Sequence, residues 1–405
     1  MCVMGSQDKG NTAIWTVKYT ILNAAYFAAF CTLHAYAAVF LLSNGFTNTE
    51  VGILLAVANI TSAIFQPVIA GVIDKPGWLT NKRYIMISVI VIMAGSLILL
   101  TVPGHKIAIF IIYALIYTVQ FAYQPVVTAI CFEYQKAGCN IIFGLARGLG
   151  SASFAVTSLF IGGMVENGGV TILLWANIIA MAVTVLITLT FIKPAGTVDT
   201  KESVSKAAGQ AHNSIRDFAA TYPAFMLFLI GTICFFFAHN MINDFMIQII
   251  RNLGGGETQL GYANFLQAIL ELPVMALIGF VLKKIKADRL LIISGIAFFI
   301  KILMLVFATS MPHMYASQFM QLFAYAVFVP AGAYYVSGVM DDLDQVKGQA
   351  YITSAITIGG VFSNLISGVI LDRFSIATML LTGSAVCAIG VIVTVIGFTR
   401  LPHHS

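Results

Sequence analysis

Twelve continuous apolar runs dominate this sequence, and each is about long enough to cross a lipid bilayer. A membrane-spanning helix needs about 20 apolar residues, and this 405-residue chain is 59% hydrophobic and only 9% charged. A soluble domain carries about 25% charged residues, so soluble, disordered and nucleic-acid-binding classes are excluded. The runs lie at 14–42, 50–73, 84–102, 107–132, 141–165, 170–192, 223–250, 258–282, 290–309, 315–340, 349–371 and 376–399.

The runs predict an all-α membrane protein with twelve transmembrane helices. Strands of a membrane β-barrel alternate apolar and polar residues over about ten positions, and these runs are continuously apolar instead. The longest polar stretch separates the first six runs from the last six. We therefore expect an N-terminal six-helix bundle at 1–192, a cytoplasmic central loop at 193–222 and a C-terminal six-helix bundle at 223–405.

Basic residues in the connections predict the orientation, because cytoplasmic loops carry an excess of Lys and Arg. With the N-terminus in the cytoplasm, three basic residues face the opposite side: Lys106, Arg251 and Arg373. Fifteen face the cytoplasm: Lys9, Lys75, Lys82, Arg83, Lys136, Lys193, Lys201, Lys206, Arg216, Lys283, Lys284, Lys286, Arg289, Lys347 and Arg400. Both termini are expected in the cytoplasm, and the protein is expected to be a multi-pass protein of the plasma membrane.

A glycine-and-charge pattern follows every third run. The first copy, which we expect to act as a conformational loop, contains Gly71, Asp74, Gly77, Lys82 and Arg83. Looser copies lie at 163–166, 279–289 and 368–374. Four copies at the same phase indicate a chain built from three-helix repeats.

The first copy resembles the G-x-x-x-D-x-x-G-x-x-x-[RK] hallmark of the major facilitator superfamily, with its spacing loosened. The resemblance covers nearly the whole chain and implies two six-helix bundles around a cavity that opens alternately to each side. The segment 143–150 also resembles the F-G-x-A-R-x-x-G segment of lactose permease and related oligosaccharide:proton symporters. That resemblance implies a sugar-binding role for Arg147 and an aromatic sugar platform at Phe154.

Other positions depart from the oligosaccharide group. Its acidic sugar ligand falls near Ala129, its histidine and glutamate fall on Gln321 and Ala324, and one of its arginines falls on Lys301. The segment 268–273 looks more like the phenylpropionate-permease and nucleoside-permease relatives. The resemblance therefore implies the superfamily and leaves the subfamily open.

Polar residues recur three or four positions apart inside several runs, so each set lies on one helix face. A single such residue often hydrogen-bonds two helices together, whereas many sets at once favour a hydrated cavity. Amides both donate and accept, which suits a polyhydroxylated solute, and neighbouring aromatic side chains either stack on a ring or pack in the core. The residues expected to bind solute are Tyr36, Gln120, Gln124, Arg147, Ser151, Phe154, Asn240, Asn243, Gln267, Gln321, Tyr325 and Asn364.

Arg147 has two interpretations. A guanidinium inside the membrane needs partners, and it forms bidentate contacts with a diol or a carboxylate. It either binds solute in this way or forms a structural pair with Glu133.

Ionisable residues inside the runs are candidates for proton coupling, because such groups are costly in a membrane. They are Lys18, His34, Arg147, His239, Asp244, Glu271 and Lys301. Glu271 and Lys301 are the leading pair, since burial makes a carboxyl hold its proton and a nearby ammonium opposes this. Asp244 is the reserve partner of Lys301, and His239 is a possible proton relay. The alternative is a static Glu271–Lys301 bridge.

Small residues predict close helix contacts at two places. Gly144 and Gly148 share a face in the run 141–165, and Gly359 and Gly360 lie together in the run 349–371. Helices approach closely, and slide, where such residues meet.

No nucleotide-binding loop and no catalytic motif occurs in the sequence, so an enzyme or an ATP-driven pump is not expected. The leading hypothesis is a proton-coupled symporter of a saccharide or glycoside. The alternatives are the same fold carrying an aromatic carboxylate, a nucleoside or a drug, including as an exporter, and a membrane sensor built on a transporter fold. We expect a monomer without cofactors or metal, with a small solute, protons and the lipid bilayer as partners and no nucleic acid.

Overall fold

The computed structural model describes residues 6–73, 77–192 and 215–400, and every regular element in these ranges is a helix. The first elements are α1 (Ser6–Phe30), the π-helical turn η1 (Cys31–Ala35), α2 (Ala37–Ser43), α3 (Asn48–Ile73), α4 (Asn81–Thr101), α5 (Lys106–Lys136), α6 (Phe143–Gly168) and α7 (Thr171–Leu189). They are followed by α8 (Ile215–Thr221), α9 (Pro223–Asp244), α10 (Met246–Asn252), α11 (Glu257–Leu282), α12 (Ala287–Val306), α13 (Met311–Gln318), the 3₁₀ turn η2 (Phe319–Leu322), α14 (Tyr325–Val339), α15 (Asp342–Arg373) and α16 (Ile376–Arg400).

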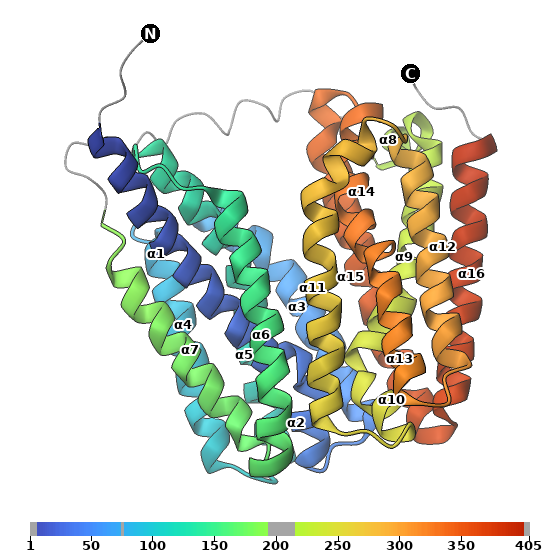
Figure 1. Ribbon diagram of the computed structural model, residues 1–405, viewed down its shortest axis with the longest axis horizontal. Helices are drawn as coiled ribbons and strands as arrows, with labels where there is room; N and C mark the ends of the chain where they lie inside the picture. The colour runs from blue at the N-terminus through green and yellow to red at the C-terminus, as the bar shows by residue number, and fades with distance from the viewer. Residues whose placement is uncertain (1–5, 74–76, 193–214, 401–405) are drawn as a thin grey trace. The chain divides into compact units, whose positions relative to one another are not determined.

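The residues pack into two compact units, whose helices Figure 1 colours in chain order. Unit 1 comprises Met1–Phe46 and Ile60–Lys201, and unit 2 comprises Thr47–Asn59 and Glu202–Ser405. Helix α3 therefore begins in unit 2 and ends in unit 1. The bundle boundaries expected from the sequence stay a prediction, and most of the expected central loop lies outside the described residues.

Every apolar run of the sequence falls on a helix or on two helices joined by a short break. Among the described residues, ten helices are long and apolar enough to cross a membrane, and the pair formed by Thr12–Ala35 and Ala37–Ser43, bent by 46°, passes the same test. Helix α11, on the remaining run, is 26 residues long. The all-helical membrane architecture is confirmed, whereas the number twelve and the orientation of the termini stay predictions.

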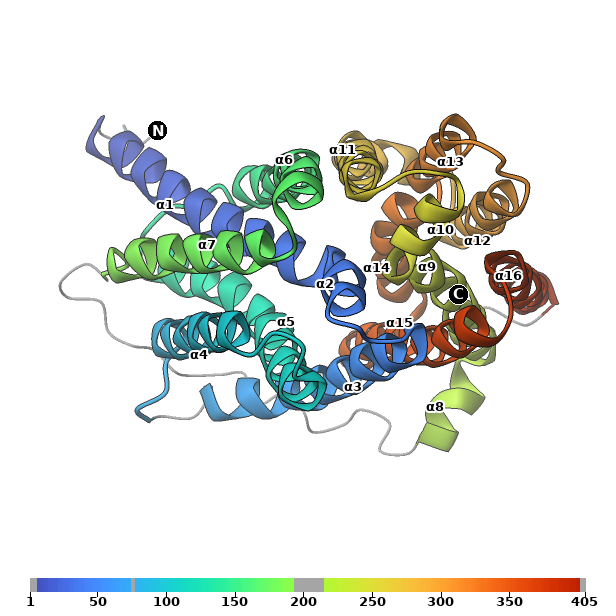
Figure 2. The ribbon, with the colours of Figure 1, turned by 90° about the horizontal axis from the view of Figure 1, so that it is seen from below.

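Helix α1 packs against α6 and α7 in unit 1, and α4 packs on α5 and α7 (Figure 2). Close packing of α1 on α6 requires Gly150, since a methyl group there would collide with Asn23 and Phe27. The close contacts expected at Gly144 and Gly148 are not found, because a methyl group at either would meet no described atom within 4 Å. Spacing identified the small residues of α6, but the rotation of the helix decides which of them faces α1.

Helix α9 is the most enclosed of the ten candidate spans. In its most apolar stretch of 18 residues, 61% of the residues are buried. Helices α15 and α16 pack closely along it. Gly359 of α15 lies against the Ile233 carbonyl, and Gly390 of α16 lies against Cys234, so that a side chain at either glycine would force the helices apart. The close contact expected at Gly359 is therefore present.

The first turn of α3 is held by Asp372, the penultimate residue of α15. The Asp372 Oδ1 atom accepts hydrogen bonds from the Asn48 backbone N–H (3.0 Å) and side-chain Nδ2 (2.9 Å), and Oδ2 accepts one from the Thr49 N–H (2.7 Å). A carboxylate satisfies the free N–H groups of a helix N-terminus and is attracted by the helix dipole. This cap keeps the start of α3 in unit 2.

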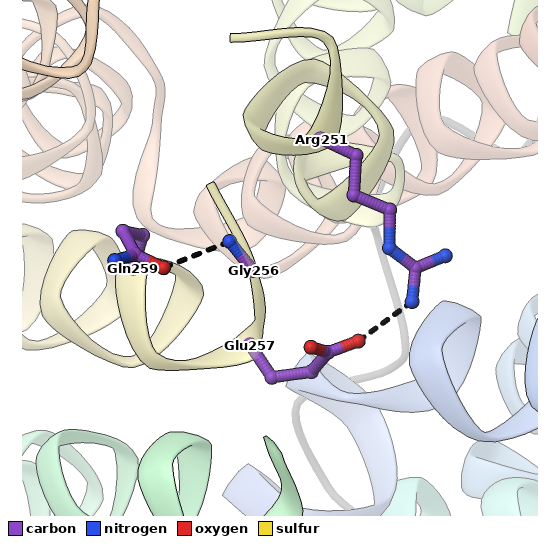
Figure 3. Close-up of polar contacts among 4 residues, drawn as sticks. All are labelled: Arg251, Gly256, Glu257 and Gln259. Atoms are coloured by element: carbon purple, nitrogen blue, oxygen red, sulfur yellow. Dashed lines mark hydrogen bonds and ion pairs between the residues drawn. The ribbon is translucent and has the colours of Figure 1, made fainter. Parts of the chain in front are cut away.

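A tight turn joins α10 to α11 (Figure 3). The Arg251 Nη2 atom lies 2.6 Å from Glu257 Oε1, and the Gly256 N–H donates to Gln259 Oε1 at 2.8 Å. The second bond caps the start of α11. It thereby orients the helix that carries Gln267 and Glu271.

Candidate functional site

Three helical elements of unit 2 bring a lysine, a glutamine and a glutamate into one hydrogen-bonded bridge. The Lys301 Nζ atom donates to Gln321 Oε1 at 2.7 Å, and Gln321 Nε2 donates to Glu271 Oε1 at 2.7 Å. Lys301 is fully buried, Gln321 is 1% exposed and Glu271 is half-buried. One amide thus connects a buried ammonium to a carboxyl through its two ends.

The position of Gln321 depends on a break in the helix of the run 315–340. Helix α13 ends at Gln318, the 3₁₀ turn η2 follows, and α14 begins at Tyr325. A 3₁₀ turn is more tightly wound than an α-helix and often marks a hinge or a functional site. The break places Gln318 and Gln321 against α11, opposite Gln267 and Glu271.

A second chain of hydrogen bonds runs beside the bridge. His239 Nε2 and Asn243 Nδ2 lie 2.9 Å apart on α9. The Gln267 Nε2 atom donates to Asn243 Oδ1 (3.3 Å) and to Gln318 Oε1 (2.6 Å). Gln267 and Glu271 are one helical turn apart on α11, so the amide chain and the charged bridge lie on neighbouring turns. The structure therefore brings together six of the predicted residues of unit 2: His239, Asn243, Gln267, Glu271, Lys301 and Gln321.

The other predicted residues of unit 2 lie around this network. The Tyr325 ring stacks on the His239 ring, with centroids 5.3 Å apart. Asn240 is half-buried on α9, where its Nδ2 atom lies against Gly360 of α15. Asp244 is the half-buried last residue of α9, and Asn364 of α15 is fully buried.

Lys301 bonds to an amide rather than to the reserve partner that the sequence suggested. Its hydrogen bond goes to Gln321. Gln321, expected to bind solute, has both ends of its amide engaged within the bridge. Gln318 was not among the residues expected at the site, yet it connects the amide chain to η2. Its position three residues before Gln321 places it on the same helix face, and this spacing could have predicted it.

Arg147 of α6 lies among aromatic rings in unit 1. Its guanidinium carbon is 4.3 Å from the centroid of the Phe27 ring, and Nη1 donates to Ser151 Oγ at 3.3 Å. Phe154 follows Ser151 on the same face and contacts the Phe30 ring at 6.3 Å. The expected group of Arg147, Ser151 and Phe154 therefore lies on one face of α6. The alternative partner, Glu133, accepts a hydrogen bond from Asn81 Nδ2 at 2.8 Å.

The remaining predicted residues of unit 1 differ in their surroundings. Tyr36 is fully buried, and its hydroxyl donates to the Ser158 carbonyl at 3.3 Å. Gln124 is half-buried on α5. Gln120 is fully buried, and neither its Nε2 nor its Oε1 atom has a hydrogen-bond partner in the described part of the chain.

His34 was noted in the sequence only as an ionisable residue inside the first run. The structure places it in the π-helical turn η1, with its ring stacked on Phe30 at a centroid distance of 4.1 Å. The π-turn carries no sequence signal that periodicity detects. It interrupts the α-helix without proline or glycine.

Two residues of the expected conformational loop hold helix ends. The Lys82 Nζ atom donates to the carbonyls of Leu189 (3.2 Å) and Phe191 (2.7 Å) after α7, where a cation is favourable. The Arg83 Nη1 atom donates to the Trp78 carbonyl at 2.6 Å.

Gly71, Asp74 and Gly77 were predicted to belong to the same conformational loop as Lys82 and Arg83. A methyl group at Gly71 would meet no described atom within 4 Å. Gly77 begins the described residues that precede α4, and Asp74 lies outside them.

Across the described ranges, no group of three or more His, Cys, Asp or Glu residues is arranged to hold a metal ion.

The model of the MFS_1 like family matches residues 16–382, most of the chain. The chain belongs to the MFS_1 like family. This membership agrees with the superfamily resemblance of the sequence and with the many apolar helices. The protein is a multi-pass membrane protein, consistent with the plasma membrane, and its solved structural neighbours are transporters rather than enzymes.

Among solved structures, this MFS_1 like chain resembles the nucleoside transporter NupG, with a TM-score of 0.80 and 15% identity over 96% of this chain and 100% of that chain. It also resembles an auto-inhibited POT family peptide transporter, with a TM-score of 0.74 and 11% identity over 96% and 97% of the two chains. A bacterial homolog of the human lysosomal transporter Spinster gives a TM-score of 0.66 and 14% identity over 97% and 96%. These likenesses show the transporter fold. None of the curated proteins matches this chain.

Proposed function

We propose that the protein is a secondary active transporter that couples proton movement to uptake of a small polar solute of the saccharide or glycoside class, by alternating access. The observation that carries the proposal is the bridge from Lys301 through Gln321 to Glu271. Buried ionisable groups inside a membrane mark ion and solute pathways. A structural role alone is served as well by apolar side chains of similar volume.

The bridge supplies a plausible chemistry for coupling. When Glu271 is ionised, its Oε1 atom accepts a hydrogen bond from Gln321 while the Gln321 carbonyl accepts one from the Lys301 ammonium. A proton taken up by Glu271 would weaken the acceptor end of this chain and loosen η2 from α11. Proton binding would thereby change the contact between two helical elements, as a coupled transporter requires.

The amide chain and Arg147 are the proposed solute-binding groups. Asn243 and Gln267 offer donors and acceptors that suit sugar hydroxyls. The Arg147 guanidinium offers a planar pair of donors beside the Phe27 ring. Each unit thus offers its own groups that suit a solute with hydroxyls and a ring.

A nucleoside is the second candidate solute. It is itself a glycoside, and the aromatic rings of unit 1 around Phe30 and Arg147 favour a solute with a flat ring. One solved structure of similar fold is a nucleoside transporter.

We further propose that both termini face the cytoplasm and that the chain crosses the membrane twelve times. Reporter fusions at the termini and in the loops test this topology.

The test of coupling uses the purified protein in proteoliposomes with an imposed proton gradient. Glu271→Gln is expected to reduce uphill uptake of labelled uridine or lactose at least about tenfold, since the amide cannot exchange a proton. Exchange of solute between the two sides, which needs no net proton movement, is expected to continue. Glu257→Gln, at the start of the same helix, is the matched control and should leave both activities intact.

Two results would contradict the proposal. Uptake driven by a sodium gradient instead of a proton gradient would exclude proton coupling. Uphill uptake that is unchanged in Glu271→Gln would remove Glu271 from the mechanism and return the bridge to a structural role.

A further inference from the structure

The His34 side chain is buried in unit 1 without a hydrogen bond to either ring nitrogen. It is 9% exposed, and neither Nδ1 nor Nε2 has a partner among the described residues. The faces of the imidazole are covered by Phe30 (4.1 Å, interplanar angle 11°) and Tyr117 (3.7 Å, 42°). The polar edge of the ring, where the nitrogens lie, is also buried in this conformation.

Gln120 presents a second buried group of the same kind. Its amide is fully buried and has no partner within the ranges that the structure describes, although its backbone carbonyl accepts a hydrogen bond from the Tyr26 hydroxyl at 3.4 Å. On α5 it shares a helix face with Tyr117 and Phe121, both of which contact the His34 ring. His34 and Gln120 thus belong to one aromatic-walled region where α1 and η1 meet α5.

Unit 1 is able to satisfy a buried amide where the role is structural. Asn177 of α7 is 1% exposed, and its side chain bonds to Ser96 Oγ (3.3 Å), to the Ala29 carbonyl (3.2 Å) and to Thr32 Oγ1 (3.4 Å). A buried polar group without a partner is destabilising, and each case calls for an explanation. His34 and Gln120 lie in one region and both retain free hydrogen-bonding positions among the described residues, so a partner from outside the chain could complete both.

The backbone at His34 departs from regular α-helical winding. The residue lies in η1, which separates α1 from α2, and the two parts of this span are bent by 46°. Single π-helical turns are frequent at functional sites, and returning such a turn to α-helical winding rotates the residues that precede it. A change in the winding of η1 would therefore change the surroundings of the imidazole edge, which the protein covers in this conformation.

We propose that His34 and Gln120 form a subsite that binds the edge of a planar nitrogen heterocycle carried by the solute. A neutral imidazole and an amide each supply one donor and one acceptor position in a plane, which matches the adjacent donors and acceptors on the edge of a nucleobase-like ring. The rings of Phe30 and Phe121 supply flat apolar walls for such a solute. The subsite deepens the proposed function and depends on it, because it names the ring portion of the transported glycoside.

The experiment measures solute affinity and thermal stability of the full-length protein in detergent. The probes are uridine, which carries a heterocycle, ribose, which is the same sugar without one, and lactose. The variants are His34→Phe, which keeps a ring between Phe30 and Tyr117, and Gln120→Leu, which keeps the side-chain volume. Asn177→Leu is the control, a buried amide of the same unit whose partners lie within the chain.

Each variant at the subsite is expected to weaken uridine binding about tenfold, the effect of one lost hydrogen bond from a buried site. Affinity for ribose or lactose should stay within about twofold of the wild type. The same variants should raise Tm by about 2 °C, because each removes an unpaired buried polar group. Asn177→Leu should lower Tm, since it leaves partners unsatisfied.

The possible failures are distinguishable. A wild-type protein that binds none of the three solutes would overturn the proposed function and the subsite together. Wild-type binding of uridine with unchanged affinity in folded His34→Phe and Gln120→Leu would overturn the subsite alone, as expected if buried water satisfies the two groups. A fall in Tm for Gln120→Leu as large as that for Asn177→Leu would assign Gln120 a structural role instead.

Discussion

The two units differ in how the buried polar side chains of their candidate sites are partnered. In unit 2, Lys301, Gln321 and Glu271 bond to one another, and a second chain of amides runs beside them. In unit 1, the side chains of His34 and Gln120 are buried without partners in the described residues. The contrast concerns these two clusters and not the units as a whole, since unit 1 also holds the fully bonded Asn177, and the described part of unit 2 also holds the buried, unpaired hydroxyls of Ser363 and Ser367.

This difference indicates a division of work. A satisfied network has a defined geometry and changes only when one of its members changes charge, which suits a proton-responsive element. Unsatisfied groups are stabilised by any molecule that completes them, which suits solute recognition. The proposal assigns coupling to unit 2 and recognition of the solute ring to unit 1.

Both features lie at irregular turns inside spans that are otherwise α-helical. The π-turn η1 carries His34, and the 3₁₀ turn η2 carries Gln321. Departures from α-helical winding are concentrated at functional sites, because they re-aim side chains that regular winding would place elsewhere. The two breaks thus point to the same places as the polar groups.

The largest effect is expected at the bridge of unit 2. Lys301→Ala should lower the free energy of unfolding by about 3 kcal/mol, because it leaves Gln321 and Glu271 buried without the ammonium. The measurement is denaturant unfolding of the purified protein. Replacing all three residues together, as Lys301→Met, Gln321→Leu and Glu271→Leu, should recover most of the loss while abolishing uphill uptake. If Lys301→Ala were as stable as the wild type, the hydrogen bonds of the bridge would not stabilise unit 2, and the contrast with the unpaired groups of unit 1 would be lost.

A smaller effect is expected at Arg147, on affinity rather than on folding. Arg147→Lys should weaken solute binding about tenfold, since an ammonium lacks the planar pair of donors and stacks less well on Phe27. The change in Tm should stay below about 2 °C, because the lysine keeps the charge over the ring. Titration calorimetry and a thermal melt of the same sample measure both. A loss of stability without a loss of affinity would assign Arg147 a structural role.

The next effect concerns the cap that Asp372 forms on the first turn of α3. Asp372→Ala should lower the free energy of unfolding by about 1 kcal/mol, the usual value of a helix N-cap. Asp372→Asn keeps one acceptor oxygen for the Asn48 and Thr49 N–H groups and should cost less. Hydrogen exchange at the first turn of α3 should speed up in the alanine variant. Unchanged exchange would show that this turn is held by packing alone.

The smallest effect is expected for the ion pair between Arg251 and Glu257. The Arg251 side chain is 44% exposed, so water screens the pair, and Glu257→Gln should change the free energy of unfolding by no more than about 0.5 kcal/mol. Thermal melts at low and high salt measure this. If Glu257→Gln changed the free energy of unfolding as much as Lys301→Ala, exposed and buried charges of unit 2 would contribute equally to stability. The buried bridge would then have no special role.

Much of the fold follows from local sequence. The apolar runs locate nearly all of the helices, because a continuous run of apolar residues as long as a bilayer is thick has few other stable conformations. Spacing also places Asn243, Gln267 and Glu271 on the inner faces of their helices. Within unit 1 the close contact of α6 falls at Gly150 rather than at Gly144 and Gly148, since spacing defines a face but does not define which neighbour it meets.

By itself the sequence determined that this chain crosses a membrane repeatedly and that a few ionisable and amide side chains are buried with it, since hydropathy acts locally along the chain. The partners of those side chains were decided only by the tertiary structure. That Lys301 bonds to Gln321, that Asp372 holds the start of α3 and that His34 lies unpaired in a π-turn depend on helix rotation and on breaks within spans. Such features arise from packing between segments far apart in the chain, which no local pattern encodes.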